Sequence, residues 1–352
     1  MSNIDSKKSN SNELLFTEYV QSWLAEKRPL VAKSTFEAMQ IYVEKHIIPY
    51  FSSLGLYTSE IRPRHIKEYY AFAYQNGRSN KPGGLSIASV RKHAMVINEV
   101  LDNAVMDEII PSNPARGVKM PARGEPVQTK RFATAEEINR ILSAFDGNIL
   151  QKVIFVAVYY GLRRSEVLGL KWKAIDFDNN TISINHTIVR NLTIEMKDST
   201  KTASSNRTYS LIEDVRKVLL ERKHEQDVEK SILGDEYVDN GYVFTRENGE
   251  ILPPDYVTKV FKAGLKKNGL PAMRFHDLRH STASILFEKG WSIKEIQLWL
   301  RHSDLSVTAD IYTHISEAHM ARKGDSLNNT FAIHGNPKQK NEDSLSHGFG
   351  SW

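Results

Sequence analysis

Four stretches in the first third of the chain carry apolar residues spaced three and four positions apart. This spacing places the apolar side chains on one face of a helix, so it predicts four amphipathic helices around a shared core. Arg28–Pro29 ends the first helix, and Ser34–Thr35 can cap the second. Arg62–Pro63 opens the third helix, and Ser86 begins the fourth. The predicted helices cover residues 14–23, 34–50, 62–72 and 86–105.

A second group of helices is predicted after residue 131. Thr134 and Glu137 form a capping-box pattern that opens a helix through Phe145. An apolar run predicts a buried helix that follows it. The remaining helical predictions are 149–160 for that buried helix, 213–229, 254–267, and helices through 273–313.

Between these helices lies a segment with the pattern of strands. Residues 181–188 alternate apolar and polar side chains, which is typical of a half-buried strand. Two shorter candidates, 192–196 and 207–211, are joined by the polar, Ser/Thr-rich residues 197–206. We therefore expect a three-stranded antiparallel sheet with a flexible hairpin, in a fold that is mainly α with a small antiparallel β-sheet.

The 352 residues predict about two domains, at about 150 residues per domain. The polar residues 1–12 and 326–352 are predicted to be disordered. Residues 13–112 form the first predicted domain and 132–325 the second. The proline-punctuated residues 113–131 join them as a basic linker, whose cations are Arg116, Lys119, Arg123, Lys130 and Arg131. Such a linker is ordinarily a solvated hinge, but between domains that close around DNA it would follow phosphates.

The composition of the chain excludes several kinds of functional site and targeting segment. The net charge of +5 is compatible with a polyanionic partner. The absence of cysteine excludes disulfides, Cys-based zinc sites and thiol nucleophiles. Residues 1–12 lack the apolar core of a secretory signal. The apolar run over 153–160 is far shorter than the roughly 20 residues of a membrane-spanning helix. We expect a cytoplasmic protein.

Residues 273–313 contain groups that could attack a phosphodiester without a metal. His276 and Arg279 are three positions apart and share one helix face. His302 stands ten positions before Tyr312. A phenol can act as nucleophile, a guanidinium can hold phosphate oxygens, and imidazoles can move protons.

Each of these residues also has a plainer interpretation. Arg163 could form a structural ion pair with Glu166, and Arg164, pointing about 100° away, competes for any functional role. Lys201 could be merely solvated, or it could protonate a leaving oxygen, with Lys197 as the alternative.

The histidines and the tyrosine are open to the same question. His276 and His280 are four apart, but Asp277 replaces the glutamate of a metalloprotease helix, so zinc is disfavoured and His280 is interpreted as a core residue. His302 could be a helix-end residue, and Tyr312 a half-buried core tyrosine.

In their order, these motifs resemble those of the tyrosine recombinase (phage integrase) family over roughly residues 12–324. The matching segments are Gly161–Glu166, Ser199–Thr202, Phe275–His280, Leu300–Ser303 and Ile311–His314. The resemblance implies a catalytic set with Tyr312 as nucleophile, namely Arg163, Lys201, His276, Arg279, His302 and Tyr312.

The resemblance also implies an architecture and an activity. It implies an N-terminal four-helix, SAM-like core-binding domain and an α+β catalytic domain that clamp duplex DNA. The implied enzyme is a site-specific recombinase that cleaves and rejoins DNA through a 3′-phosphotyrosine, integrating or excising a mobile element without metal or cofactor. The implied partners are double-stranded DNA, a homotetramer on two sites, and an accessory excisionase or host DNA-bending proteins. Candidate DNA contacts are Arg78, Lys81, Arg91, Arg116, Lys119, Arg123, Lys130 and Arg131.

Two departures and two alternatives accompany the resemblance. Arg301 stands where the family usually has glycine, and no additional N-terminal domain is visible, so binding to arm-type sites is not expected. The first alternative is a type IB topoisomerase-like enzyme that relaxes supercoils alone. The second is a DNA-binding protein that keeps the fold without catalysis.

Overall fold

The computed structural model describes residues 14–121, 132–190, 194–197 and 207–301. The chain divides into two compact units, one of residues 1–130 with 189–195 and the other of residues 131–188 with 196–352. The segments 1–12 and 326–352, predicted to be disordered, lie outside the described residues.

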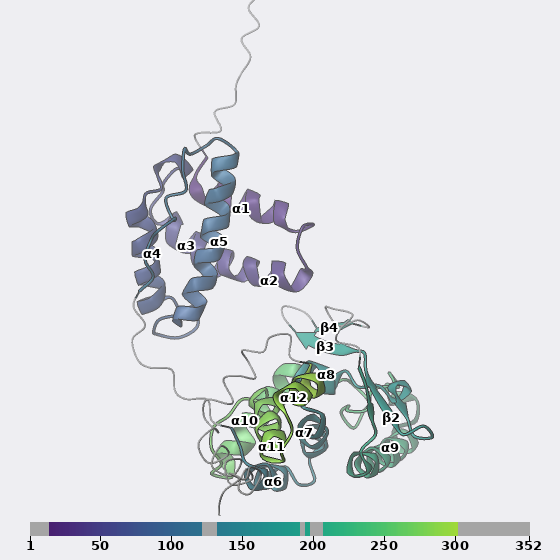
Figure 1. Ribbon diagram of the computed structural model, residues 1–352. Helices are drawn as coiled ribbons and strands as arrows, with labels where there is room; N and C mark the ends of the chain where they lie inside the picture. Colours follow the sequence, from purple (N-terminus) through teal and green to yellow (C-terminus); the bar gives the residue numbers. More distant parts are fainter. Residues whose placement is uncertain (1–13, 122–131, 191–193, 198–206, 302–352) are drawn as a thin grey trace, which may run out of the picture. The chain divides into compact units, whose positions relative to one another are not determined.

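The first unit is built from the four predicted helical stretches. The pairs α1 with α2 and α4 with α5 lie side by side (Figure 1). A π-helical turn, η2, continues α2 directly into α3, so the second predicted stretch forms one helical run. The elements are α1 (Phe16–Lys27), α2 (Lys33–Tyr42), η2 (Val43–Ile47), α3 (Ile48–Ser52), η3 (Thr58–Glu60), α4 (Pro63–Asn76) and α5 (Ile87–Met106).

Helix starts in this unit test the predicted caps. The hydroxyl of Ser86 accepts a hydrogen bond from the Ser89 amide at 3.2 Å, so Ser86 caps α5 and begins this helix as predicted. The prediction that Ser34–Thr35 caps the second helix was wrong. That helix begins at Lys33 after Ala32, whose side chain offers no cap, so it is stabilised by burial of its apolar face instead.

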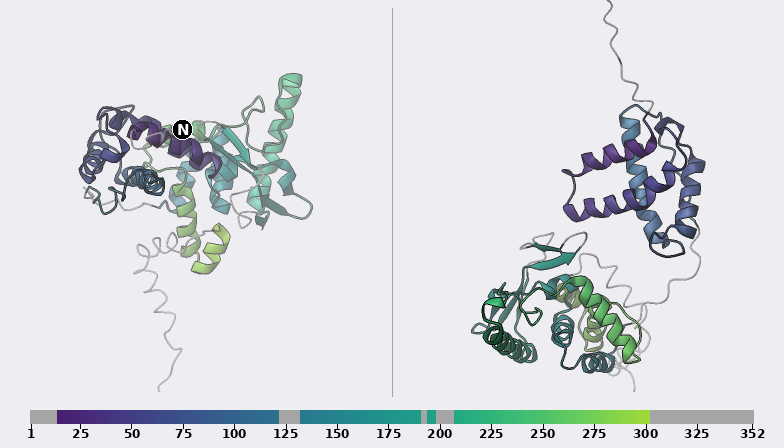
Figure 2. Two further views of the ribbon diagram at one scale, coloured as in Figure 1. Left: turned by 90° about the horizontal axis from the view of Figure 1, so that it is seen from above. Right: turned by 180° about the vertical axis from the view of Figure 1, so that it is seen from behind.

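The second unit is organised around the buried helix α7 (Ile149–Tyr160). It contacts α6 (Ala135–Ala144), α8 (Arg164–Leu168), α9 (Glu213–Leu233) and α11 (Asp277–Glu288). Figures 1 and 2 show α9 and β2 on one side of α7 and α10, α11 and α12 on the other. The other elements are η4 (Trp172–Ala174), η6 (Gly234–Glu236), α10 (Pro254–Lys267) and α12 (Ile293–Leu300).

Two small antiparallel sheets follow α8 along the chain. The three-stranded sheet has the order β1 (Ile175–Asp176), β2 (Thr181–Ile184), β5 (Arg207–Ser210), with Ile182 opposite Tyr209 and Ile184 opposite Arg207. β3 (Thr187–Arg190) and β4 (Ile194–Lys197) form a separate pair.

The prediction of one strand over 181–188, paired in a single three-stranded sheet with 192–196 and 207–211, was therefore wrong. The chain leaves the first sheet because the backbone at His186 and Thr187 packs directly on Gly169. A Cβ at Gly169 would lie 2.5 Å from the His186 carbonyl oxygen. Such close approach of two backbones is a tertiary contact that local alternation does not report.

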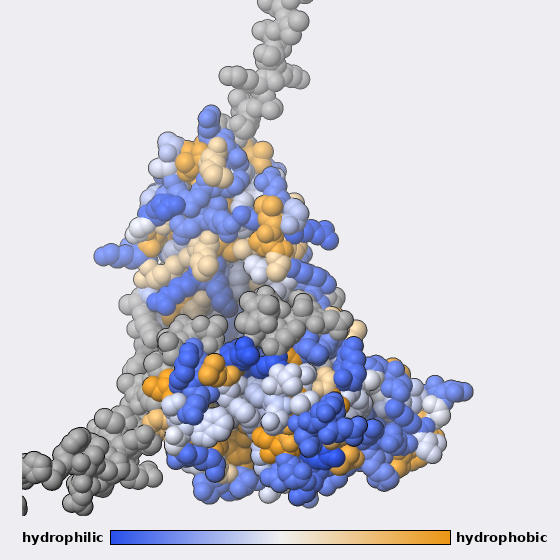
Figure 3. Space-filling view, turned by 45° about the vertical axis from the view of Figure 1, so that its right-hand side comes forward, coloured by the Kyte–Doolittle hydropathy of each residue, from blue (hydrophilic) through white to orange (hydrophobic). Residues whose placement is uncertain are grey.

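Within the described residues, no helix combines the length and the apolar character needed to cross a membrane. Hydrophilic residues cover most of the described surface in Figure 3, with hydrophobic residues scattered among them.

Candidate active site

The candidate site begins at the turn between α7 and α8. Gly161 ends α7 in the left-handed conformation with φ 59°. Arg163 follows as the residue that precedes α8, and Glu166 in the first turn of that helix reaches back to it. The Arg163 amide donates to Glu166 Oε2 at 2.8 Å, and its Nη1 donates to Oε1 at 2.8 Å. The ion pair proposed as a plain interpretation of Arg163 is therefore present, with 39% of the Arg163 side chain still exposed.

A second arginine binds the same carboxylate from the sheet. Arg207 is the first residue of β5, and its Nη2 donates to Glu166 Oε2 at 2.9 Å. Its side chain is 2% exposed, and its guanidinium lies 5.4 Å from the centre of the Tyr209 ring. Arg207 was not among the site residues predicted from the sequence. The sequence signal that could have identified it is the alternation along β5, which places Arg207 on the same inward face as Tyr209.

The third arginine joins three segments that are far apart in the sequence. Arg279 in α11 is 1% exposed. Its Nη1 donates to the Gly161 carbonyl at 2.5 Å, and its Nη2 donates to the Leu300 carbonyl. The end of α7, the start of α11 and the end of α12 are thus held by one guanidinium.

These four side chains form a cluster with more positive than negative charge. Burial would raise the pKa of Glu166, but Arg207, Arg163 and Arg279 outweigh it and keep the pKa below its ordinary value. Burial, followed by the positive charge of Arg163, lowers the pKa of Arg279 to about 9. The arginine cluster (Arg163, Arg207, Arg279 and Glu166) therefore holds three cations and one anion, an arrangement that favours binding of a further anion.

His276 lies beside this cluster, immediately before α11. Desolvation, together with the charges of Arg279 and Arg163, lowers the pKa of His276 below its ordinary 6.5. The imidazole is therefore neutral at neutral pH and able to accept a proton. His280, one turn later, is 7% exposed and meets the His276 ring edge-on at 5.1 Å, as expected for a packed core histidine.

The structure brings together only part of the predicted catalytic set. Arg163, His276 and Arg279 lie around one cluster. Lys201, His302 and Tyr312 lie outside the described residues, as does most of the hairpin that carries Lys201. Arg164 points elsewhere and donates to the Thr258 hydroxyl on α10, which confirms that Arg163 and Arg164 diverge.

Arg301 follows α12 in the left-handed conformation, with φ 53° and ψ 54°. Glycine adopts this conformation without strain, whereas an L side chain does not. The geometry therefore gives a physical reason for the glycine that the family resemblance led us to expect at this position.

The candidate DNA contacts divide into three groups. The side chains of Arg78, Lys81, Arg91 and Lys119 are exposed. Arg116 is exposed too, but its Nη2 lies 3.0 Å and 2.9 Å from the two carboxylate oxygens of Asp102, so part of its charge is neutralised. The linker residues outside the described part of the chain are Arg123, Lys130 and Arg131.

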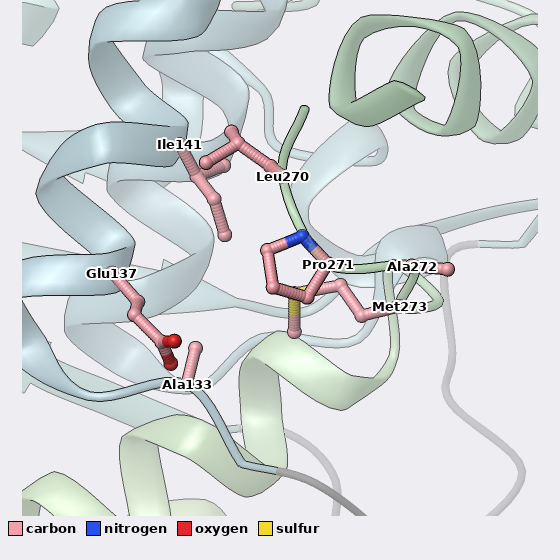
Figure 4. A pocket seen from close by; sticks show the side chains of 7 residues that line it. All are labelled: Ala133, Glu137, Ile141, Leu270, Pro271, Ala272 and Met273. Atoms are coloured by element: carbon pink, nitrogen blue, oxygen red, sulfur yellow. The ribbon is translucent and has the colours of Figure 1, made fainter. Parts of the chain in front are cut away.

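The cavity in Figure 4 lies apart from the arginine cluster. It measures about 20 Å³ and is bounded by α6 and the loop that precedes α11. Its lining is Ala133, Glu137, Ile141, Leu270, Pro271, Ala272 and Met273. A space of this size holds about one water molecule, so it is not a ligand site.

Comparison with known families gives two matches along the chain. Residues 131–319 match the model described as "Phage integrase family". Residues 15–73 match the model described as "Phage integrase, N-terminal SAM-like domain".

Individual relatives agree with these matches. A "Tyrosine recombinase XerC-like" protein of Caldanaerobacter subterraneus subsp. tengcongensis is 30% identical over 333 residues, covering 89% of this chain and 83% of the relative. The ICEBs1 integrase of Bacillus subtilis is 27% identical over 327 residues, covering 91% of this chain and 84% of the relative.

Two solved structures share the fold. The Tn1549 transposon integrase in complex with a circular intermediate DNA has a TM-score of 0.69 at 19% identity, covering 90% of this chain and 100% of that chain. A lambda integrase dimer bound to a core site has a TM-score of 0.61 at 17% identity, covering 85% of this chain and 95% of that chain.

Proposed function

Because the chain belongs to the phage integrase family of tyrosine recombinases, we propose that it recombines DNA at specific sites by attack of Tyr312 on a phosphodiester. The observation that carries this proposal is the arginine cluster, in which three guanidinium groups surround one carboxylate. Such a site is complementary to a phosphate that gains negative charge in its transition state.

In the proposed reaction, Arg163 and Arg279 hold the non-bridging oxygens of the scissile phosphate. A phenol with a pKa near about 10 is mostly protonated at neutral pH, so His276 accepts the proton of Tyr312 as its oxygen attacks phosphorus. The bond to the 5′ oxygen breaks as Lys201 protonates that oxygen, and His302 adds a hydrogen bond to the phosphate. The 3′-phosphotyrosine keeps the energy of the broken bond, so rejoining needs no cofactor.

The domains have separate roles in this proposal. Residues 13–112 bind the core DNA site, residues 113–131 follow the phosphates between domains, and residues 132–325 carry the chemistry. The proposed partner is double-stranded DNA, since the Tn1549 and lambda integrases were both solved with DNA. Recombination of two sites by four protomers in the bacterial cytoplasm, with an excisionase or host DNA-bending protein where direction is controlled, completes the proposal.

The test is capture of the covalent intermediate. The purified chain, in EDTA, is incubated with a duplex nicked near the junction of the mobile element that encodes it, so that the cleaved end cannot rejoin. We expect a denaturation-resistant protein–DNA adduct from the wild-type chain and from Tyr256→Phe, a control at a tyrosine that is 40% exposed. Tyr312→Phe should bind the same DNA and form none. An adduct that survives Tyr312→Phe would disprove the assignment of the nucleophile.

A further inference from the structure

Arg207 is a charged residue in a place normally given to an apolar one. It faces inward at the start of β5, opposite Ile184 of β2. With only 2% of its side chain exposed, the guanidinium is removed from water. Its Nη2 binds Glu166, while Nε and Nη1 have no hydrogen-bond partner among the described residues.

This arrangement does not stabilise the fold. A buried guanidinium with donors left unsatisfied costs free energy, and an apolar side chain of similar length would fill the same space without that cost. The cation-π contact with Tyr209 offsets only part of the penalty. A residue that is costly for folding and touches the site is expected to serve the site.

Glu166 explains what Arg207 can do there. The Glu166 carboxylate is the one anion of the arginine cluster, and its charge acts on Arg207, Arg163 and Arg279. Without Arg207, Glu166 would neutralise Arg163 and Arg279 more fully, and Oε2 would lose its bond from the sheet. With Arg207 in place, the carboxylate is held from two sides and its charge is offset by a residue other than the two that grip the phosphate.

We propose that Arg207 is a positioning residue for strand cleavage, which fixes Glu166 against Arg163 and leaves the charges of Arg163 and Arg279 available to the scissile phosphate. This inference rests on the proposed function. Arg207 itself is not assigned a contact with DNA, and it acts through Glu166.

Arg222 offers a matched control in the same unit. It is also a buried arginine, 2% exposed, and its Nη1 and Nη2 donate to Glu229 at 2.8 Å and 3.1 Å. Its other partners, Glu225, Val243 and Thr245, lie outside the arginine cluster. Replacement of Arg222 therefore has the folding cost of a lost buried ion pair without the effect on the phosphate.

The experiment compares single-turnover adduct formation, at saturating DNA, by wild type, Arg207→Gln, Arg207→Lys, Arg222→Gln and Arg222→Lys. Each protein is tested on the nicked duplex and on the same duplex with an uncharged methylphosphonate at the scissile position. Arg207→Gln should cleave the normal duplex about 100-fold more slowly with unchanged DNA affinity. Arg207→Lys, which keeps the charge but not the forked donor, should fall between Arg207→Gln and wild type.

The methylphosphonate separates an electrostatic role from a purely structural one. With no phosphate charge to neutralise, the deficit of Arg207→Gln relative to wild type should shrink at least about tenfold. Arg222→Gln should show the same ratio to wild type on both duplexes.

The inference is overturned if Arg207→Gln cleaves the normal duplex at the wild-type rate. It is equally overturned if the variant loses the same factor on both duplexes, as Arg222→Gln does. If Arg207→Gln does not fold, the comparison of the two duplexes is made with Arg207→Met, which also removes the charge, and decides in the same way. A wild-type chain that forms no adduct would contradict the proposed function instead.

Discussion

Gly161 is a position where a single added methyl group should be strongly destabilising. Its φ of 59° lies in the left-handed region, where an alanine costs about 1–2 kcal/mol. A Cβ there would also lie 2.0 Å from Cδ2 of Leu300. Leu300 is fully buried, so its side chain cannot turn into solvent, and overpacking of this kind costs about 1–3 kcal/mol. Gly161→Ala should therefore lower the free energy of unfolding by about 2–5 kcal/mol.

Gly147 separates the two contributions. It lies in the same unit with φ 69°, and no atom lies within 4 Å of the position that a Cβ would occupy. Gly147→Ala should therefore cost only the backbone term of about 1–2 kcal/mol.

The assay is urea unfolding followed by pulse proteolysis, which distinguishes the two units by the size of the surviving fragment. If Gly147→Ala and Gly161→Ala lower the free energy of unfolding by the same amount, the reasoning is refuted. Equal values would mean that the Leu300 side chain can move away from the new methyl group without a loss of stability. Gly161→Ala should also slow adduct formation, since the Gly161 carbonyl accepts a hydrogen bond from Arg279.

Three other substitutions test the site more directly. Arg279→Lys should slow adduct formation by about 100-fold or more in single-turnover assays, because an ammonium group cannot donate to both carbonyls and also bind a phosphate; a wild-type rate would show that the fork is dispensable. Arg301→Gly should raise the free energy of unfolding by about 1 kcal/mol in urea, since it relieves the left-handed backbone, and a loss would mean that contacts of the side chain outweigh the strain. The cleavage rate should fall with an acid limb below pH 6.5, where His276 becomes protonated, and His276→Gln should lack that limb in a pH–rate profile.

Helices whose ends are marked by capping or helix-ending residues were predictable from the sequence. The bounds predicted for α7 and α10 agree with the structure, because Asn148 caps one end of α7, Gly161 ends it, and Pro254 is the first residue of α10. The capping box of Thr134 and Glu137 is likewise present. In these cases the residues that decide the boundary lie within one turn of it, so local reasoning is sufficient.

The strands and the cluster depend on contacts between distant residues. The separation of β2 from β3 follows from the packing of residues 186–187 on Gly169, and the importance of Arg207 follows from a carboxylate 41 positions earlier. The pairing of Arg163 with Glu166 was foreseen as one of two interpretations. The structure shows that the pair also belongs to a larger group of charges, so the ion pair does not exclude a role for Arg163 in the site.

The hydrogen bonds of Arg279 to two main-chain carbonyls have a consequence for mutational tolerance. Both acceptors are main-chain carbonyls, those of Gly161 and Leu300, and every amino acid provides such a carbonyl. No side-chain replacement at position 300 can delete its acceptor, so that position can drift among apolar residues of similar volume as long as the backbone keeps its course. Position 279 has no such latitude, because both bonds originate there. The link between these three segments therefore tolerates side-chain changes at the residues that accept the hydrogen bonds. It is lost by replacement of the one residue that donates them, Arg279.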